Sequence, residues 1–270
     1  MVDSLSIFFM LISALLIFLF PLGLAVYMYK KARISLKPIF VGALLFIVFQ
    51  FLTRIPLINF FSTQPWFQNL MGSPFFSILL VGGLTAGLFE ESGRYLGFRF
   101  FLKKELAWEN GIAYGIGHGG IEAISLAGIS NINNIVISMM INTGTFDSVI
   151  APQIGAETAA MLKTQLISTA PVIFLAGGLE RLFAMLIQIA LSLVVLYAVM
   201  NRKFTYLVYA VLLHAMVNAS SVLLLRQGFS IWLVEFWLFM LAVAAVAFIQ
   251  RSQRLFARTS IHAVGSEEGE

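Results

Sequence analysis

The chain has 270 residues, of which 60% are hydrophobic and 11% are charged, and its formal net charge is +4. Soluble domains carry about 25% charged residues, so this composition excludes a soluble globule and indicates an integral membrane protein in contact with the lipid bilayer. The absence of cysteine excludes disulfides and thiolate metal sites, so a metal ion would need histidine, carboxylate, amide or water ligands. We expect the basic residues to set membrane topology, and we do not expect nucleic acid as a partner.

Apolar stretches of about 20 residues predict an all-α fold, a polytopic membrane helical bundle with seven to eight transmembrane helices. The first stretch lacks a basic leading region and a small-residue cleavage site, so we interpret it as an uncleaved helix. Residues 131–142 either extend the fourth span or lie at the membrane interface. The seven expected spans are residues 4–29, 38–55, 75–102, 107–130, 171–200, 204–225 and 229–250.

Lysine and arginine residues are divided unequally between the two sides of these spans. By the positive-inside rule, the side richer in them faces the cytoplasm, which predicts an external N-terminus and a cytoplasmic C-terminus. Arg94 and Arg181 fall inside spans. The side with fewer lysine and arginine residues carries Arg54, Lys163 and Arg226. The richer side carries Lys30, Lys31, Arg33, Lys37, Arg99, Lys103, Lys104, Arg202, Lys203, Arg251, Arg254 and Arg258.

The segment 143–170 joins the fourth and fifth spans and is the one sizeable external segment expected. It mixes polar side chains such as Asp147, Glu157 and Lys163 with apolar ones. This mixture favours an amphipathic element at the membrane interface over a free linker. Such an element could cover a cavity as a lid.

Three short motifs place polar or ionisable residues inside the third, fourth and sixth expected spans. An ionisable side chain near the centre of a bilayer costs several kcal/mol unless it is paired or solvated, so each motif is a candidate functional site. Residues at positions i and i+4 share a helix face, so each motif can present two polar groups to one cavity. The motifs are Glu90-Glu91-Ser92-Gly93-Arg94, His118-Gly119-Gly120-Ile121-Glu122 and His214-Ala215-Met216-Val217-Asn218.

The predicted topology places the key residues of these motifs at similar depths. At a rise of about 1.5 Å per residue, Glu90, His118 and His214 each lie roughly 15–20 Å from the cytoplasmic end of their span. Gln188 of the fifth span lies at the same level. Glycines spaced four apart, at positions 111, 115 and 119, allow neighbouring helices to approach closely. We therefore expect these helices to share one site.

The polar residues at this depth suit the hydrolysis of a peptide bond within the membrane. Two histidines and a carboxylate are a common ligand set for Zn²⁺ with an open water position, and a second carboxylate can accept a proton from that water. His118, Glu122 and His214 are the candidate metal ligands. In a metal-free alternative, a glutamate and a histidine activate water while the other histidine and Asn218 hydrogen-bond the developing oxyanion.

The combined motifs resemble those of the clan of CAAX prenyl proteases, bacteriocin-processing proteases and PrsW-type membrane peptidases. They are Glu-Glu-x-x-Arg from Glu90 to Arg94, an aromatic residue four positions before a histidine (Tyr114 to His118), and His-x-x-x-Asn beginning at His214. The sequences Glu-Glu-Ser-Gly-Arg-Tyr and His-Gly-Gly-Ile-Glu-Ala are most similar to the YhfC-like branch of intramembrane metalloproteases. This resemblance implies an intramembrane endopeptidase in a bacterial cell membrane that acts on a membrane-associated protein or peptide.

The resemblance covers residues 75–225, and we expect one peptidase-like helical domain over residues 1–250 followed by a cytoplasmic polar tail over residues 251–270. Zn²⁺ is a candidate cofactor beside the metal-free alternative. The implied catalytic residues are Glu90, Glu91, Arg94, His118, His214 and Asn218.

The resemblance also implies a role for each of these residues. Glu90 would activate the water together with His118, and Glu91 would support the site. His214 and Asn218 would stabilise the oxyanion or hold a metal. The guanidinium of the arginine at position 94 would compensate the paired carboxylates, because two adjacent anions in a low dielectric cannot both stay ionised cheaply.

Two other classes of protein remain open from the sequence. Paired intramembrane carboxylates and histidines also form proton relays, so a proton-coupled transporter is one alternative. A catalytically inactive membrane scaffold that binds a partner helix is the other.

Overall fold

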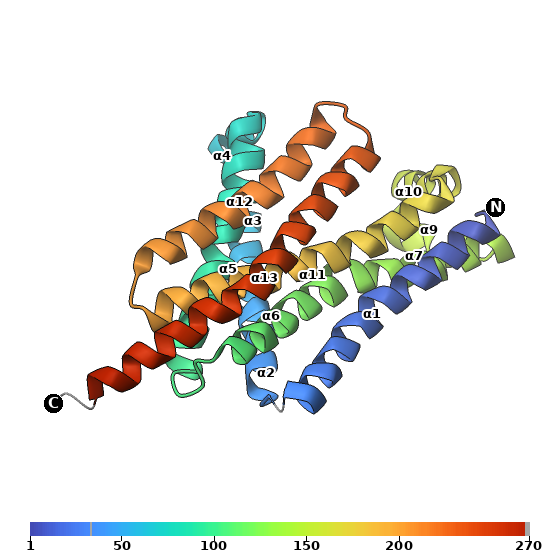
Figure 1. Ribbon diagram of the computed structural model, residues 1–270. Coiled ribbons are helices and arrows are strands. Elements are labelled where there is room, and N and C mark those ends of the chain that lie inside the picture. The colour runs from blue at the N-terminus through green and yellow to red at the C-terminus, as the bar shows by residue number, and fades with distance from the viewer. Residues whose placement is uncertain (33, 268–270) are drawn as a thin grey trace. The chain divides into compact units, whose positions relative to one another are not determined.

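A computed structural model describes the backbone of residues 1–32 and 34–267, and the side chains of residues 1–31 and 34–257. The described backbone is helical throughout, with short connections (Figure 1). Within it, seven helical stretches are long and apolar enough to cross a membrane. The predicted all-α, polytopic membrane fold is therefore confirmed.

The helices differ in length, and several long helical runs are interrupted by π-helical segments, which are labelled η. The α-helices are α1 (Ser4–Ala32), α2 (Lys37–Phe46), α3 (Ile55–Ser62), α4 (Pro65–Met71), α5 (Thr85–Leu96), α6 (Trp108–Glu122), α7 (Ile129–Thr143), α8 (Phe146–Val149), α9 (Ala151–Ile154), α10 (Ala156–Ser168), α11 (Pro171–Met200), α12 (Phe204–Arg226) and α13 (Ile231–Glu267). The π-helical segments are η1 (Ile47–Arg54), η2 (Phe75–Leu84), η3 (Gly97–Phe101) and η4 (Ala123–Gly128).

Three of the expected spans are longer in the structure, beginning with the second. The second span runs from Lys37 to Ser62, longer than predicted. Arg54, which was expected on the external side near the end of this span, has further helix on both sides of it. There it donates hydrogen bonds to the Thr85 hydroxyl and the Val81 carbonyl at 3.0 and 2.9 Å. These bonds explain how a basic side chain is accommodated in an otherwise apolar span.

The fourth and last helical stretches are also longer than expected. The fourth runs from Trp108 to Thr143, so residues 131–142 extend the span. Helix α13 continues to Glu267, so much of the predicted polar tail is helical backbone. A helix of 36 residues is about 54 Å long, which exceeds the thickness of a bilayer with its headgroups, so the fourth stretch must tilt or project from the membrane.

The chain divides into two compact units, residues 1–22 with 122–182 and residues 23–121 with 183–270. The prediction of one domain over residues 1–250 stays a prediction.

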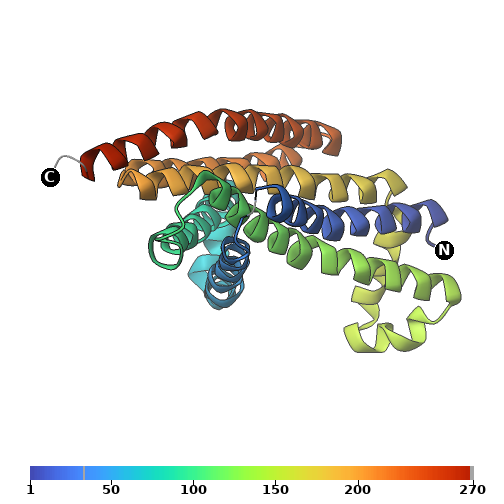
Figure 2. The same ribbon diagram turned by 60° about the horizontal axis from the view of Figure 1, so that its bottom comes forward.

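In the first unit, Val2, Met10, Phe146 and Leu166 belong to one buried apolar cluster. Asn142 secures the N-terminus there by bonding to both backbone groups of Val2, at 2.7 and 2.9 Å. The predicted external element is thus an ordered group of helices, α8 to α10, anchored beside α7 (Figure 2).

In the second unit, α12 packs against η2 and α5, and α2 packs against α5. Glycines allow the backbones in this unit to touch. A Cβ atom placed on Gly117 of α6 would lie 1.9 Å from the Ile39 carbonyl oxygen of α2, and one on Gly42 would lie 2.2 Å from that of Tyr114. The predicted close packing of Gly111, Gly115 and Gly119 is also present, and all three face α11. These contacts place α2, α5, α6, α11 and α12 around one buried region.

We expect Gly117→Ala to destabilise this packing, because the added methyl group would overlap a backbone carbonyl that cannot move without displacing α2. Overpacking of this kind costs about 1–3 kcal/mol. Thermal unfolding of the detergent-purified protein should show a lower midpoint temperature. Gly23→Ala is the matched control, since nothing lies within 4 Å of its added Cβ atom. Equal midpoints for the two variants would contradict the close approach of α2 and α6.

The orientation in the membrane stays a prediction, with the N-terminus outside and the C-terminus in the cytoplasm. The sequence contains no cysteine, so single cysteines introduced at Ser4 and Ser266 report their side of the membrane without background. We expect a membrane-impermeant thiol reagent to label position 4 in intact cells, and position 266 only after permeabilisation. Labelling of both positions from one side would refute the predicted topology.

Candidate active site

Four helices of the second unit bring the polar residues of the motifs together. Helix α5 contributes Glu90, Glu91 and Arg94, all of which are buried. Helix α6 contributes His118 and helix α12 contributes His214, with 1% and 3% of their surfaces exposed. The fourth helix, α11, contributes a buried glutamine at position 188. The three motifs therefore form one site, as the common depth predicted.

Glu90 lies between the two histidines. Its Oε2 atom is 3.0 Å from Nε2 of His118, within hydrogen-bonding distance, and 3.8 Å from Nε2 of His214. The same ring nitrogen of each imidazole therefore points toward one carboxylate oxygen. Because these residues come from three helices, their convergence depends on tertiary packing.

Glu91 orients His214 from the opposite edge of the imidazole ring. Its Oε1 atom is 2.6 Å from Nδ1 of His214, which donates the hydrogen bond because a carboxylate accepts. This contact favours the tautomer in which Nε2 carries a lone pair and faces Glu90. A carboxylate that holds a histidine in this way is a common outer partner of a metal ligand, and it fixes the ring and raises its basicity.

Arg94 neutralises the inner carboxylate. Its Nη1 atom lies 3.1 Å from Glu91, and its Nη2 donates a hydrogen bond to Gln188 Oε1. Gln188 is held in turn by Ser192, whose hydroxyl donates to the Gln188 backbone carbonyl at 2.8 Å. A charged pair buried from water needs hydrogen bonds to compensate for its lost hydration. Here both terminal nitrogens of the guanidinium have partners, while its Nε atom is buried and has none among the described residues.

Aromatic rings fix the orientation of His118. The Phe46 ring meets the imidazole edge to face at a centroid distance of 5.0 Å, and Tyr114 stacks on it at 6.3 Å. The Tyr114 hydroxyl is buried, and among the described residues it has no hydrogen-bond partner. The predicted aromatic residue four positions before the histidine therefore serves as a wall for the imidazole.

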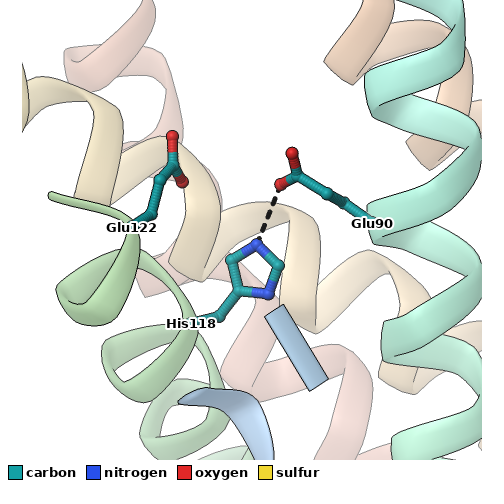
Figure 3. A group of neighbouring side chains, drawn as sticks. All are labelled: Glu90, His118 and Glu122. Carbon is teal, nitrogen blue, oxygen red and sulfur yellow. Dashed lines mark hydrogen bonds and ion pairs between the residues drawn. The ribbon is translucent and has the colours of Figure 1, made fainter. Parts of the chain in front are cut away.

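Three side chains form a group that could hold a metal ion. Glu90, His118 and Glu122 each offer a ligand atom, and these atoms lie within 4.8 Å of one another. Figure 3 shows the carboxylates of Glu90 and Glu122 on either side of the His118 imidazole, facing a common space. Glu122 is the last residue of α6, so this helix places it one turn after His118.

The donor atoms fit a zinc ion by type and by spacing. Imidazole nitrogen and carboxylate oxygen are common Zn²⁺ ligands, and two atoms bound tetrahedrally at about 2.1 Å lie about 3.4 Å apart. In this group, Glu90 Oε2 and His118 Nε2 are 3.0 Å apart, close to this value, and the ligand atoms of all three residues lie within 4.8 Å of one another. The metal group differs from the predicted set, since it contains Glu90 where His214 was expected, although His214 adjoins Glu90 from the other side.

Asn218 is the predicted site residue that stands apart from this network. It lies one turn beyond His214 on α12, is half-buried, and has no hydrogen-bond partner among the described residues. Its amide is therefore available to a ligand. Gln188, in contrast, was left undecided between packing and site lining, and it is a direct partner of Arg94. The depth of Gln188 in its span, level with Glu90, was the one feature of the sequence that indicated its place in the site.

We expect Arg94→Ala to be strongly destabilising, because it removes the positive charge that pairs with the buried Glu91 carboxylate and the hydrogen bond that Arg94 donates to Gln188. Breaking a buried ion pair from one side costs about 3–5 kcal/mol. Thermal unfolding in detergent should show a large fall in midpoint temperature, and Arg94→Lys should recover part of it by keeping the charge.

The matched control for this prediction is Lys163→Ala. It breaks an ion pair of 2.7 Å with Asp147, but that pair is exposed. An exposed pair contributes about 0–1 kcal/mol. If Arg94→Ala were no less stable than Lys163→Ala, the buried network would not be a stabilising element.

Membrane-spanning helices around a buried cluster of glutamates and histidines define a polytopic membrane protein with a candidate metal site. The chain belongs to the YhfC intramembrane metalloprotease family, whose model matches residues 16–238. A Bacillus subtilis (strain 168) protein described as "Uncharacterized membrane protein YhfC" is 38% identical over 258 residues, which cover 95% of this chain and 100% of that protein. No solved structure shows a significant match. The resemblance and the bacterial membrane location predicted from the sequence are confirmed.

Proposed function

We propose that this protein is an intramembrane endopeptidase that hydrolyses a peptide bond of a membrane-associated protein or peptide. The observation that carries the proposal is the approach of His118 Nε2 and His214 Nε2 to one Glu90 oxygen in a buried site. The membership in a family named for intramembrane metalloproteases supports it. A site for hydrolysis needs a base, groups that polarise the carbonyl, and a way to hold water in an apolar environment.

We assign His118, Glu122 and His214 as the metal ligands, the set expected from the sequence. His118 and Glu122 belong to the group whose ligand atoms lie within 4.8 Å of one another, and His214 Nε2 lies 3.8 Å from the Glu90 oxygen that His118 Nε2 also approaches. When bound there, Zn²⁺ would lower the pKa of its bound water and polarise the peptide carbonyl. Glu91 keeps the His214 ring turned so that Nε2 faces the site, and Arg94 keeps Glu91 in place. The burial of the two histidines, Glu91 and Arg94 excludes bulk water and strengthens the electrostatic contacts among them.

Glu90 is the proposed general base. Its carboxylate accepts a proton from the water, whose oxygen attacks the carbonyl carbon of the scissile bond, and the protonated carboxyl then returns that proton to the leaving amine. We assign the Asn218 amide, one turn beyond His214, to donate a hydrogen bond to the carbonyl oxygen as negative charge develops on it. The two carboxylates thus have different roles, with Glu90 acting on protons and Glu122 acting as a ligand.

The test is a comparison of membrane proteomes from cells that produce the wild-type protein or Glu90→Ala. We expect fragments that end within membrane-spanning segments to be present with the wild type and absent with the variant. Glu157→Ala is the control, since this carboxylate is exposed and lies outside the site. An identical set of fragments with the wild type and Glu90→Ala would contradict the proposed function.

A further inference from the structure

An apolar groove lies between η2 and α12 in the second unit. Its volume is about 650 Å³, and it is lined almost entirely by hydrocarbon. Buried small residues, Ala215 and Ala219, line the groove, while the lining side chains Phe75, Leu79 and Met216 are exposed. Both segments belong to candidate membrane spans, so the groove meets hydrocarbon and not water. Its occupant must therefore be apolar along this length.

The length of the groove matches one leaflet of a bilayer. On α12 its lining extends from Leu212 to Leu223, and eleven steps of about 1.5 Å span about 16 Å. The hydrocarbon core of a bilayer is about 30 Å thick, so one leaflet contributes about 15 Å. A transmembrane helix would need a groove about twice as long, whereas a single acyl chain needs one of this length.

One end of the groove carries a positive charge without an acidic partner. Arg226, at the end of α12, is exposed and donates a long hydrogen bond of 3.4 Å to the Ser77 hydroxyl. The sequence contains no aspartate or glutamate in residues 51–89 or 201–234, which include both walls of the groove. Within the described residues, Arg226 forms no ion pair with a carboxylate. The guanidinium is therefore available to an anion.

This end of the groove also has the features of a membrane interface. The turn between α12 and α13 and the short helix α4 both lie at the top of Figure 1. Trp66 of α4 and Trp232 of α13 are each about half exposed there, at 51% and 50%. Tryptophan is enriched at the level of lipid headgroups, so Arg226 lies where a phosphate would be found.

We propose that this groove is a binding site for an anionic phospholipid, with the phosphate at Arg226 and one acyl chain along η2 and α12. The proposal does not depend on the proposed peptidase activity. Ala215 and Ala219 directly follow His214 and Asn218 in the chain, so a bound acyl chain would contact the helix that carries two residues of the candidate active site. Lipid occupancy would thereby restrict the movement of that helix.

The test is native mass spectrometry of the full-length protein in detergent, titrated with phosphatidylglycerol or with phosphatidylcholine of the same acyl chains. We expect tighter binding of phosphatidylglycerol to the wild type, and about a fivefold loss of that affinity in Arg226→Gln. Met216→Trp, which fills the groove, should weaken binding of both lipids on the order of tenfold, the loss expected if about two CH₂ groups lose burial. Leu79→Trp should act in the same way from the other wall.

Arg251→Gln is the control for charge, because it removes the same charge from an exposed position on α13. Equal loss of phosphatidylglycerol binding in Arg226→Gln and Arg251→Gln would overturn the proposal, since the binding would then follow net charge alone. Unchanged lipid binding in both tryptophan variants would overturn it as well. A dimer of the wild type that dissociates in the tryptophan variants without a change in lipid affinity would assign the groove to a second copy of the chain.

Discussion

Glu90→Gln should abolish peptide-bond cleavage while leaving the fold intact. The amide keeps the shape of the side chain but cannot take a proton from water, and a positioned general base contributes about 10²–10⁴-fold to a rate. The measurement is the initial rate of fragment formation from a substrate identified in the proteome comparison, reconstituted with the purified protein in liposomes. Thermal unfolding should show little change, since the amide can still hydrogen-bond to His118.

Glu157→Gln is the matched control, because it makes the same chemical change at an exposed carboxylate. It should cleave at the wild-type rate. If Glu90→Gln also cleaved at that rate, Glu90 would not be the base, and Glu91 would be the next carboxylate to test. If Glu90→Gln lost its activity because it no longer folded, Glu90→Asp would test the assignment of the base. This variant keeps the carboxylate and should retain part of the rate.

His118→Ala, His214→Ala and Glu122→Gln should each lower the zinc content of the purified protein, whereas Glu90→Gln should retain most of it. Metal binding requires deprotonated ligands in the correct number, and the loss of one ligand leaves too few to hold the ion. Glu91→Gln should have a smaller effect, about a 10–100-fold loss of affinity, because it only orients His214. Elemental analysis after dialysis against defined zinc concentrations would measure both effects.

The third histidine of the sequence, His262, provides the control for these metal measurements. It belongs to the C-terminal region whose side chains lie outside the described residues. His262→Ala should keep the wild-type zinc content. Zinc content that falls only in His262→Ala would place the metal outside the candidate active site. Wild-type protein that binds no zinc under any of these conditions would favour the metal-free mechanism, in which Glu90 and His118 activate water directly.

These two predictions distinguish the role of a general base from that of a metal ligand, which the distances alone do not distinguish. Glu90 and Glu122 both belong to the group that could hold a metal. A base and a ligand differ in what their amide variants lose, because a base loses the rate and a ligand loses the ion. The pair of variants Glu90→Gln and Glu122→Gln therefore assigns each carboxylate by a different measurement.

The sequence alone determined the class of this protein and indicated most of the residues that meet in its candidate site. The apolar stretches had to be buried in lipid, and an ionisable residue in lipid needs a partner, so the motifs at Glu90, His118 and His214 were conspicuous. Spacing along a helix and the rise per residue then indicated their common depth. These arguments are local or one-dimensional, which is why they succeeded without coordinates.

Only the tertiary structure decided which atoms meet. The sequence could not show that Glu90 lies between two histidines while its neighbour Glu91 turns to His214 and Arg94, because adjacent residues on a helix point about 100° apart and their partners come from other helices. It also could not show the hydrogen bonds from Arg54 to Thr85 and Val81, which make a charge acceptable within a span. Hydrophobic patterns report how deep a residue lies, and packing between helices decides what it contacts.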